Sequence, residues 1–163
     1  MRYRTRQLGV VEIAKDKVLY LVAPLLGFEA FRKYALIPVP SAQPFFCLQS
    51  LEEPQLAFPV ILADELGMAY PIRTDDLRRV GATSADEVAC WIVAALPAGG
   101  AGKLRLNLHA PILVNARKQL AAQIVLGDEC LIVRTEIVHE VRSAHFACEA
   151  GAESEVSAES ARS

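Results

Sequence analysis

Prolines divide this 163-residue chain into short apolar runs. Proline lacks a backbone N–H and fixes φ, so it interrupts helices and the central strands of sheets. The residues between the prolines are rich in Val, Ile, Leu and Phe, which favours short strands. The prolines that separate the runs are residues 38, 40, 44, 54, 59, 71, 97 and 111. The pattern predicts an all-β, mainly antiparallel protein, in which short strands form a small barrel or sandwich.

The predicted strands follow the apolar runs. Two runs around the polar stretch 14–17 predict a hairpin over residues 8–22. Further strands are expected at 35–39, 45–49, 57–62, 87–96, 104–108, 112–114, 123–126 and 130–134. A chain of this length forms one domain with a single core.

One short helix is predicted over residues 75–80, where it would cap the barrel. Acidic residues occupy its first turn, Arg78 and Arg79 its last, and Gly81 the position after its end. Ser84 and Glu87 have capping-box spacing, but Glu87 opens an apolar run, so at most one helical turn fits there. The loop 23–28 combines a proline, a glycine and apolar residues, and is either a binding loop or a plug over one barrel end.

The end of the chain is less regular. Residues 135–150 fit either a strand that continues up to Val138 or a helix with Ile137, Val141 and Ala144 on one face. Residues 149–163 are rich in Ala, Ser and Glu, a composition that favours disorder. We expect a barrel domain at 1–138 and a C-terminal extension at 139–163 that is largely a disordered tail.

Charge and composition exclude several classes of function. A net charge of −2 gives no basic footprint for direct nucleic-acid binding. The apolar runs are shorter than the roughly 20 residues of a membrane helix, and no secretory signal opens the chain, so we expect a cytoplasmic protein with no membrane contact. The four cysteines lie far apart, which indicates reduced, mostly buried thiols.

Catalytic and metal-binding patterns are missing from the sequence. His139, Glu140 and His145 do not have HExxH spacing, and His109 is isolated and expected to point outward from a strand end. No GxSxG elbow is present, and the glycines at 99–102 lack phosphate-loop spacing. We therefore expect no metal, no cofactor and no enzyme activity.

Acidic residues are concentrated in the middle of the chain. Between Glu52 and Glu87 there are eight acids against three arginines, a local balance of −5. Such a stretch would attract a basic protein partner.

Two paired motifs give the sequence a family resemblance. PFFCLQS at 44–50 is followed by LAF at 56–58, and NLHAPILVN at 107–115 is followed by QIVL at 123–126. Together with LGFE at 26–29 and ALIP at 35–38, they resemble the flagellar assembly factor FliW family over residues 8–134. The resemblance implies an antiparallel β-barrel capped by a helix. It also implies a cytosolic regulator that binds flagellin and, when flagellin is exported, binds the RNA-binding repressor CsrA and relieves its repression of flagellin translation.

The resemblance and the charge together predict the site. We expect the loop after LQS to contact the partner through Glu52, Glu53 and Gln55. Further acids are expected to support this contact by their charge, and these are Asp64, Glu65, Asp75 and Asp76. Four further residues lie in the family signatures: Phe28, Gln49, Asn107 and Asn115. We expect them to have a structural role, and the three amide side chains can form hydrogen bonds to the backbone at strand ends.

One position departs from the family resemblance. Cys47 replaces an aromatic that is usual in the family, which would remove an anchor from the binding face.

Two other classes of function remain open. A small-molecule-binding barrel or an enzyme would instead show a pocket of about 300 Å³ or more with converging polar groups. A structural subunit would bury a large apolar surface between copies of itself.

Overall fold

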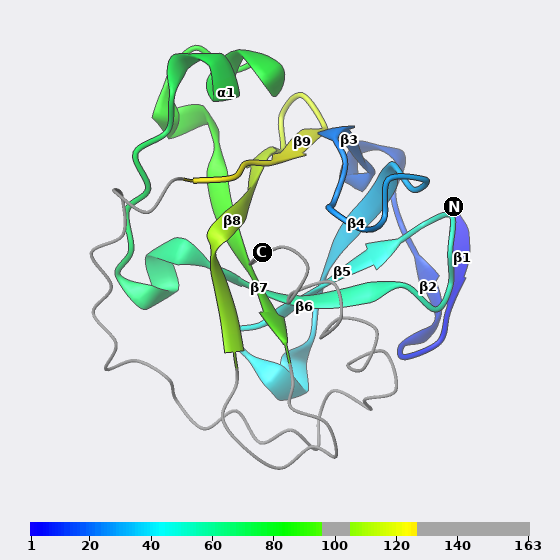
Figure 1. The fold of residues 1–163 in the computed structure, drawn as a ribbon. Coiled ribbons are helices and arrows are strands. Elements are labelled where there is room, and N and C mark those ends of the chain that lie inside the picture. The colour runs from blue at the N-terminus through cyan, green and yellow to red at the C-terminus, as the bar shows by residue number, and fades with distance from the viewer. Residues whose placement is uncertain (96–104, 127–163) are drawn as a thin grey trace.

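The computed structural model describes residues 1–95 and 105–126, and within them seven strands close into a barrel in the order β3 to β9 (Figure 1). The strands are Leu19–Ala23 (β3), Lys33–Pro38 (β4), Phe46–Ser50 (β5), Ala57–Leu62 (β6), Ala89–Ala95 (β7), Arg105–Asn115 (β8) and Leu120–Gln123 (β9). Neighbours pair antiparallel except β3 and β9, which run parallel and close the ring. The predicted all-β barrel is confirmed.

Alternating side chains fill the barrel. Leu19 and Leu21 of β3 point inward and join Tyr34, Phe58 and Ile112 in the central cluster, where all five are buried. Full burial of a side chain of this size contributes about 1.5–3 kcal/mol, so each of these five residues stabilises the barrel.

Three separate covers protect the outer face of the barrel. A hairpin of β1 (Arg2–Thr5) and β2 (Gly9–Glu12) packs with Ile13 and Val18 over β4. The 3₁₀ turns η2 (Pro40–Ala42) and η3 (Ala63–Leu66) cover β5, β6 and β7. The helix α1 (Thr74–Arg79) covers β8 and β9 (Figure 1).

The predicted helix is confirmed as α1. Leu77 is buried on its inner face and packs with Val80 against Leu113 and Ala122 of the barrel. Gly81 follows with φ +67°, the left-handed conformation that ends helices and that glycine adopts without strain. The single turn after Ser84 also forms, as the 3₁₀ helix η4 (Ala85–Glu87).

The hairpin predicted over residues 8–22 is wrong. Residues 15–17 form a 3₁₀ helix, η1 (Lys15–Lys17), and the two runs around it join different sheets. β2 pairs back with β1, whereas β3 enters the barrel between β4 and β9. The arginines of β1 hid this strand from the sequence analysis, although Tyr3 and Thr5 alternate with them toward the protein.

Two strands at the end of the barrel also differ from the prediction. Segments 104–108 and 112–114 are one strand, β8, in which Pro111 sits at an irregularity opposite β7. A proline is tolerated there because the ladder is already interrupted. His109 consequently lies mid-strand, half-buried, and not at a strand end. The strand predicted at 123–126 is shifted, because β9 ends at Gln123. The amides of Ile124 and Leu126 nevertheless donate hydrogen bonds to the carbonyls of Pro111 and His109.

The loop 23–28 plugs one barrel end. Leu25 is buried in the central cluster, and the ring of Phe28 lies edge-on to Phe58 with 5.1 Å between centroids. Several expectations lie outside the described residues. They concern the 97–102 loop, the 130–134 strand, the residues from 135 onward and the domain boundary at 138. No helix among the described residues is long and apolar enough to cross a bilayer.

Candidate functional site

Glu52 lies in the β5–β6 loop and is engaged by the backbone. Its Oε2 accepts hydrogen bonds from the amides of Arg32 at 2.6 Å and Lys33 at 2.9 Å. Desolvation acts to raise the pKa of this carboxyl, but the two amides and the positive charges of Arg32 and Lys33 outweigh it and lower the pKa. Glu52 therefore fixes the start of β4, in addition to any role toward a partner.

The rest of this loop is held from beneath by Gln49. Its Nε2 donates to the carbonyls of Ser50 at 2.9 Å and Leu56 at 3.0 Å, and the side chain is fully buried. Above it, Glu53 accepts a hydrogen bond from the amide of Gln55 at 3.0 Å, and Gln55 is exposed. The loop is thus a rigid turn with Glu53 and Gln55 at its surface.

Asp64 and Glu65 lie in η3, at the opposite end of β6 from this loop. Six residues of strand separate the two sites, which is about 20 Å. Both side chains are exposed, and neither carboxylate forms a hydrogen bond or ion pair within the part of the chain that the structure describes. These two acids are therefore free to meet a cationic partner.

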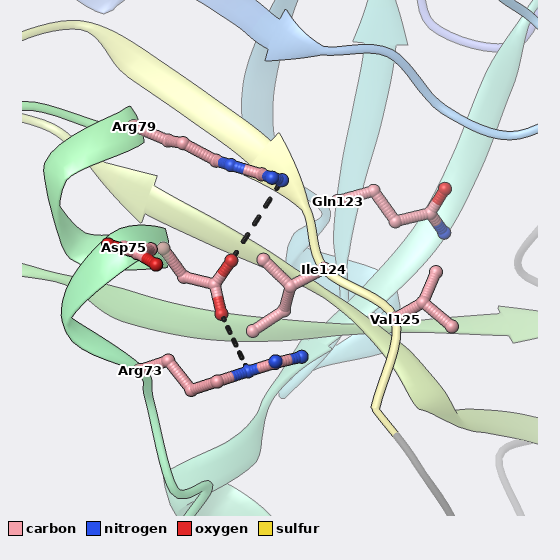
Figure 2. Close-up of a pocket in the computed structure, with 7 residues that line it drawn as sticks. Arg73, Asp75, Arg79, Gln123, Ile124 and Val125 are labelled. Atoms are coloured by element: carbon pink, nitrogen blue, oxygen red, sulfur yellow. Dashed lines mark ion pairs between the residues drawn. The ribbon is translucent and has the colours of Figure 1, made fainter.

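Asp75 and Asp76 of α1 line a hollow of about 320 Å³ between the helix and the end of β9 (Figure 2). Asp76 is buried, and Arg73 and Arg79 reach it from two sides at 3.7 and 3.9 Å. Asp75 is exposed and pairs with Arg78 at 3.4 Å. The remaining lining residues are Gln123, Ile124 and Val125.

The polar side chains that line this hollow already have partners within the protein. Gln123 accepts a hydrogen bond from the amide of Leu26 at 2.9 Å and donates to the carbonyl of Ala110 at 3.2 Å. Asp76 already faces two guanidinium groups. The volume of the hollow meets the threshold set above for a small-molecule site, but its charged and amide groups are already engaged, by ion pairs at α1 and by hydrogen bonds to the backbone of Leu26 and Ala110.

The structure does not bring the seven predicted partner-binding residues into one patch. They form three groups: the β5–β6 loop, η3 and α1. Of the acids, Glu52, Glu53, Asp75 and Asp76 have partners within the protein, which leaves Asp64 and Glu65 as the free pair.

The two described cysteines are free thiols without nucleophilic character. Burial raises the pKa of Cys47 to about 12, and burial with the charge of Asp64 raises the pKa of Cys90 to about 11. Both are therefore protonated at neutral pH. Because Cys47 is 1 % exposed under η2 and η3, this position presents no side chain to a partner.

The signature asparagines are both buried in β8. Asn115 donates to the carbonyl of Val80 at 2.9 Å and accepts from the amide of Lys118 at 3.2 Å, which ties the end of α1 to the barrel. Asn107 has no hydrogen-bond partner for its Oδ1 among the described residues. The described residues also contain no group of His, Cys, Asp or Glu suited to a metal ion.

The fold also gathers cations that the sequence analysis did not single out. The β8–β9 turn meets η1 because Gln119 Nε2 donates to the carbonyls of Lys15 at 2.6 Å and Val18 at 2.9 Å. As a result, three short basic pairs lie around β3. They are Lys15 with Lys17, Arg32 with Lys33, and Arg117 with Lys118. Their only sequence signal was their charge, because up to about a hundred residues separate them.

Comparisons with known proteins decide the family. The family model described as FliW protein matches residues 2–137 of the chain. The chain belongs to the FliW family. The flagellar assembly factor FliW of Treponema denticola is 32% identical over 146 residues, which cover 88% of this chain and 98% of that protein. FliW of Bdellovibrio bacteriovorus is 32% identical over 135 residues, 82% of this chain and 77% of its own length.

A solved structure agrees with this assignment. The crystal structure of a flagellar assembly factor FliW superposes with a TM-score of 0.69 at 26% identity, covering 78% of this chain and 90% of that one. The sequence-based resemblance to FliW is confirmed. These relatives are named as assembly factors, not as enzymes.

Proposed function

We propose that this protein is a cytoplasmic FliW-family regulator that binds flagellin and antagonises CsrA, so that flagellin synthesis follows flagellar assembly. It acts by binding proteins and catalyses no reaction. Membership of the FliW family supports the assembly role. The exposed, unpaired Asp64–Glu65 pair is the observation that carries the binding chemistry.

Charge explains how such a protein would silence an RNA binder. A CsrA-type repressor needs basic surface to hold RNA phosphates. Carboxylates that are not already paired inside the protein can approach that surface and compete with the phosphates or repel them. Asp64 and Glu65 meet this requirement better than Glu52, whose charge is used by two backbone amides.

The assignment is tested by calorimetric titration of the purified protein with its cognate flagellin and CsrA. Asp64→Lys combined with Glu65→Lys should weaken CsrA binding about tenfold, or about 1.4 kcal/mol, with the loss shrinking as salt is added. The melting temperature should stay within about 1 °C, because both side chains are exposed and unpaired.

Glu12→Lys is the matched control, since Glu12 is an exposed acid on the β1–β2 hairpin. It should leave CsrA affinity unchanged. Absence of binding to both partners would reject the proposed function, and equal losses in the control and the double variant would reject the role of η3.

The double reversal Glu52→Lys with Glu53→Lys is unsuitable as a test of partner binding. It would also destabilise the protein, because Glu52 supports β4. Glu53→Lys alone probes that loop more cleanly, because the carboxylate of Glu53 accepts one local hydrogen bond.

A further inference from the structure

The outer face of β3 is the part of the barrel wall between the covers. The β1–β2 hairpin packs over β4 on one side, and α1 packs over β8 and β9 on the other. Tyr20 and Val22 point outward from β3, since Leu19 and Leu21 point into the core. Their exposed fractions are 45% and 44%.

Cations surround these two apolar side chains. Lys33 stands directly opposite Tyr20 on β4, and Leu120 stands opposite on β9. Lys118 belongs to the turn between β8 and β9 and lies near the end of α1, with its Cγ 3.6 Å from the position a Cβ would take at Gly81. Lys15 is brought in by the hydrogen bond from Gln119.

We define the β3 surface as Tyr20 and Val22 with the charged residues around them. Its cations are Lys15, Lys17, Arg32, Lys33, Arg117 and Lys118, and its acids are Asp16 and Glu52. Six cations against two acids leave a balance of +4. A chain with a net charge of −2 thus carries a positive surface with an apolar centre.

We propose that the β3 surface docks a protein segment that carries both acidic and apolar side chains. The apolar pair would be desolvated at the centre, and the cations would form a charged rim that sets orientation and association rate. This inference rests on the proposed function. Of the two partners proposed above, CsrA is cationic and is repelled by this surface, so flagellin is the partner that supplies the segment.

Two separate surfaces also explain how the protein would exchange flagellin for CsrA. The β3 surface and the Asp64–Glu65 pair belong to different parts of the barrel, because β3 is followed in the ring by β4 and β5 before β6 and η3 are reached. A typical partner covers about 800 Å² of a protein this small. Two partners can then exclude each other by their bulk, without a shared footprint.

The test compares three proteins in titrations with purified flagellin and, separately, with CsrA. Lys33→Glu combined with Lys118→Glu reverses two rim charges whose side chains are exposed. Tyr20→Ser removes the larger of the two side chains at the apolar centre. Arg2→Glu combined with Arg4→Glu is the matched control, because both arginines are exposed on the β1–β2 hairpin.

We expect the rim variant and Tyr20→Ser each to weaken flagellin binding at least tenfold while CsrA binding is unchanged or tighter, and the hairpin control to bind flagellin like the wild type. Unchanged flagellin binding in both test variants overturns the inference while leaving the proposed function in place. Loss of CsrA binding instead of flagellin binding overturns the assignment of partners.

Two other occupants give distinct results. If light scattering shows a wild-type dimer that the rim variant dissociates, a second copy occupies the surface and the inference is wrong. If the rim variant binds flagellin more tightly, an acidic segment of the chain itself, such as the glutamates at 149–159, occupies the surface and the inference is again wrong. A wild-type protein that binds neither partner rejects the proposed function itself.

Discussion

Individual acidic residues in this protein have different roles although they look alike in sequence. Glu52 accepts hydrogen bonds from two backbone amides, Asp76 is buried between two arginines, and the carboxylates of Asp64 and Glu65 have no partner within residues 1–95 and 105–126. A charge count treats them equally, because hydrogen bonds to amides distant in the chain leave no local signal. The proposed function assigns the free pair to a partner.

The role of Glu52 gives a prediction on stability and pH. Glu52→Gln should lower the free energy of unfolding by about 1 kcal/mol, a value reduced for solvent screening because the carboxylate is exposed. The pKa of Glu52 is lowered in the folded protein, so its contribution is complete above its unfolded value of about 4.3 and is lost as pH falls through the folded pKa.

Urea unfolding at pH 7 and at pH 3 measures this. The wild type and Glu52→Gln should differ at pH 7, and this difference should be smaller at pH 3, whereas the surface variant Glu12→Gln should match the wild type at both. A difference between wild type and Glu52→Gln that is as large at pH 3 as at pH 7 would contradict the electrostatic role.

At the scale of elements, the short helix α1 depends on the barrel. A helix of six residues is not stable alone, so its position is set by packing and by bonds to its ends. Asn115 supplies the bond at its end, since its Nδ2 donates to the carbonyl of Val80. The sequence predicted this helix well because its acids, arginines and Gly81 are all local signals.

Asn115→Ala should therefore destabilise the protein by about 2 kcal/mol, because the carbonyl of Val80 and the amide of Lys118 lose their partners in a buried site. Asn107→Ala removes the same atoms from the same strand, but the Oδ1 of Asn107 has no partner among the described residues. Chemical denaturation should show the smaller loss for Asn107→Ala. Equal losses would mean that cavity formation, not the tie to α1, sets the cost.

Pairing between elements was harder to predict than their existence. Strand β6 was expected at its observed bounds, because its apolar run is flanked by turn residues. The partner of β2 was mistaken, since two apolar runs around a polar stretch fit a hairpin as well as two strands of different sheets. Such pairing is decided by burial of one face against distant residues.

At the scale of the whole molecule, the fold sorts charge in a way that the sequence conceals. The barrel class and the family followed from prolines, apolar runs and the paired motifs, and all were confirmed. The predicted acidic site is spread over three elements, whereas the cations of the β3 surface come together from three distant segments. Closure of the ring between β3 and β9 produces that arrangement, and no local pattern announces it.

We propose that this barrel binds two partners through two surfaces of opposite charge. Hydrogen–deuterium exchange of the full chain, alone and with saturating CsrA or flagellin, tests it most directly. CsrA should slow exchange around residues 62–68, and flagellin should slow exchange at 15–23, 32–34 and 116–121. Protection of the same segments by both partners, or of neither region, would contradict it.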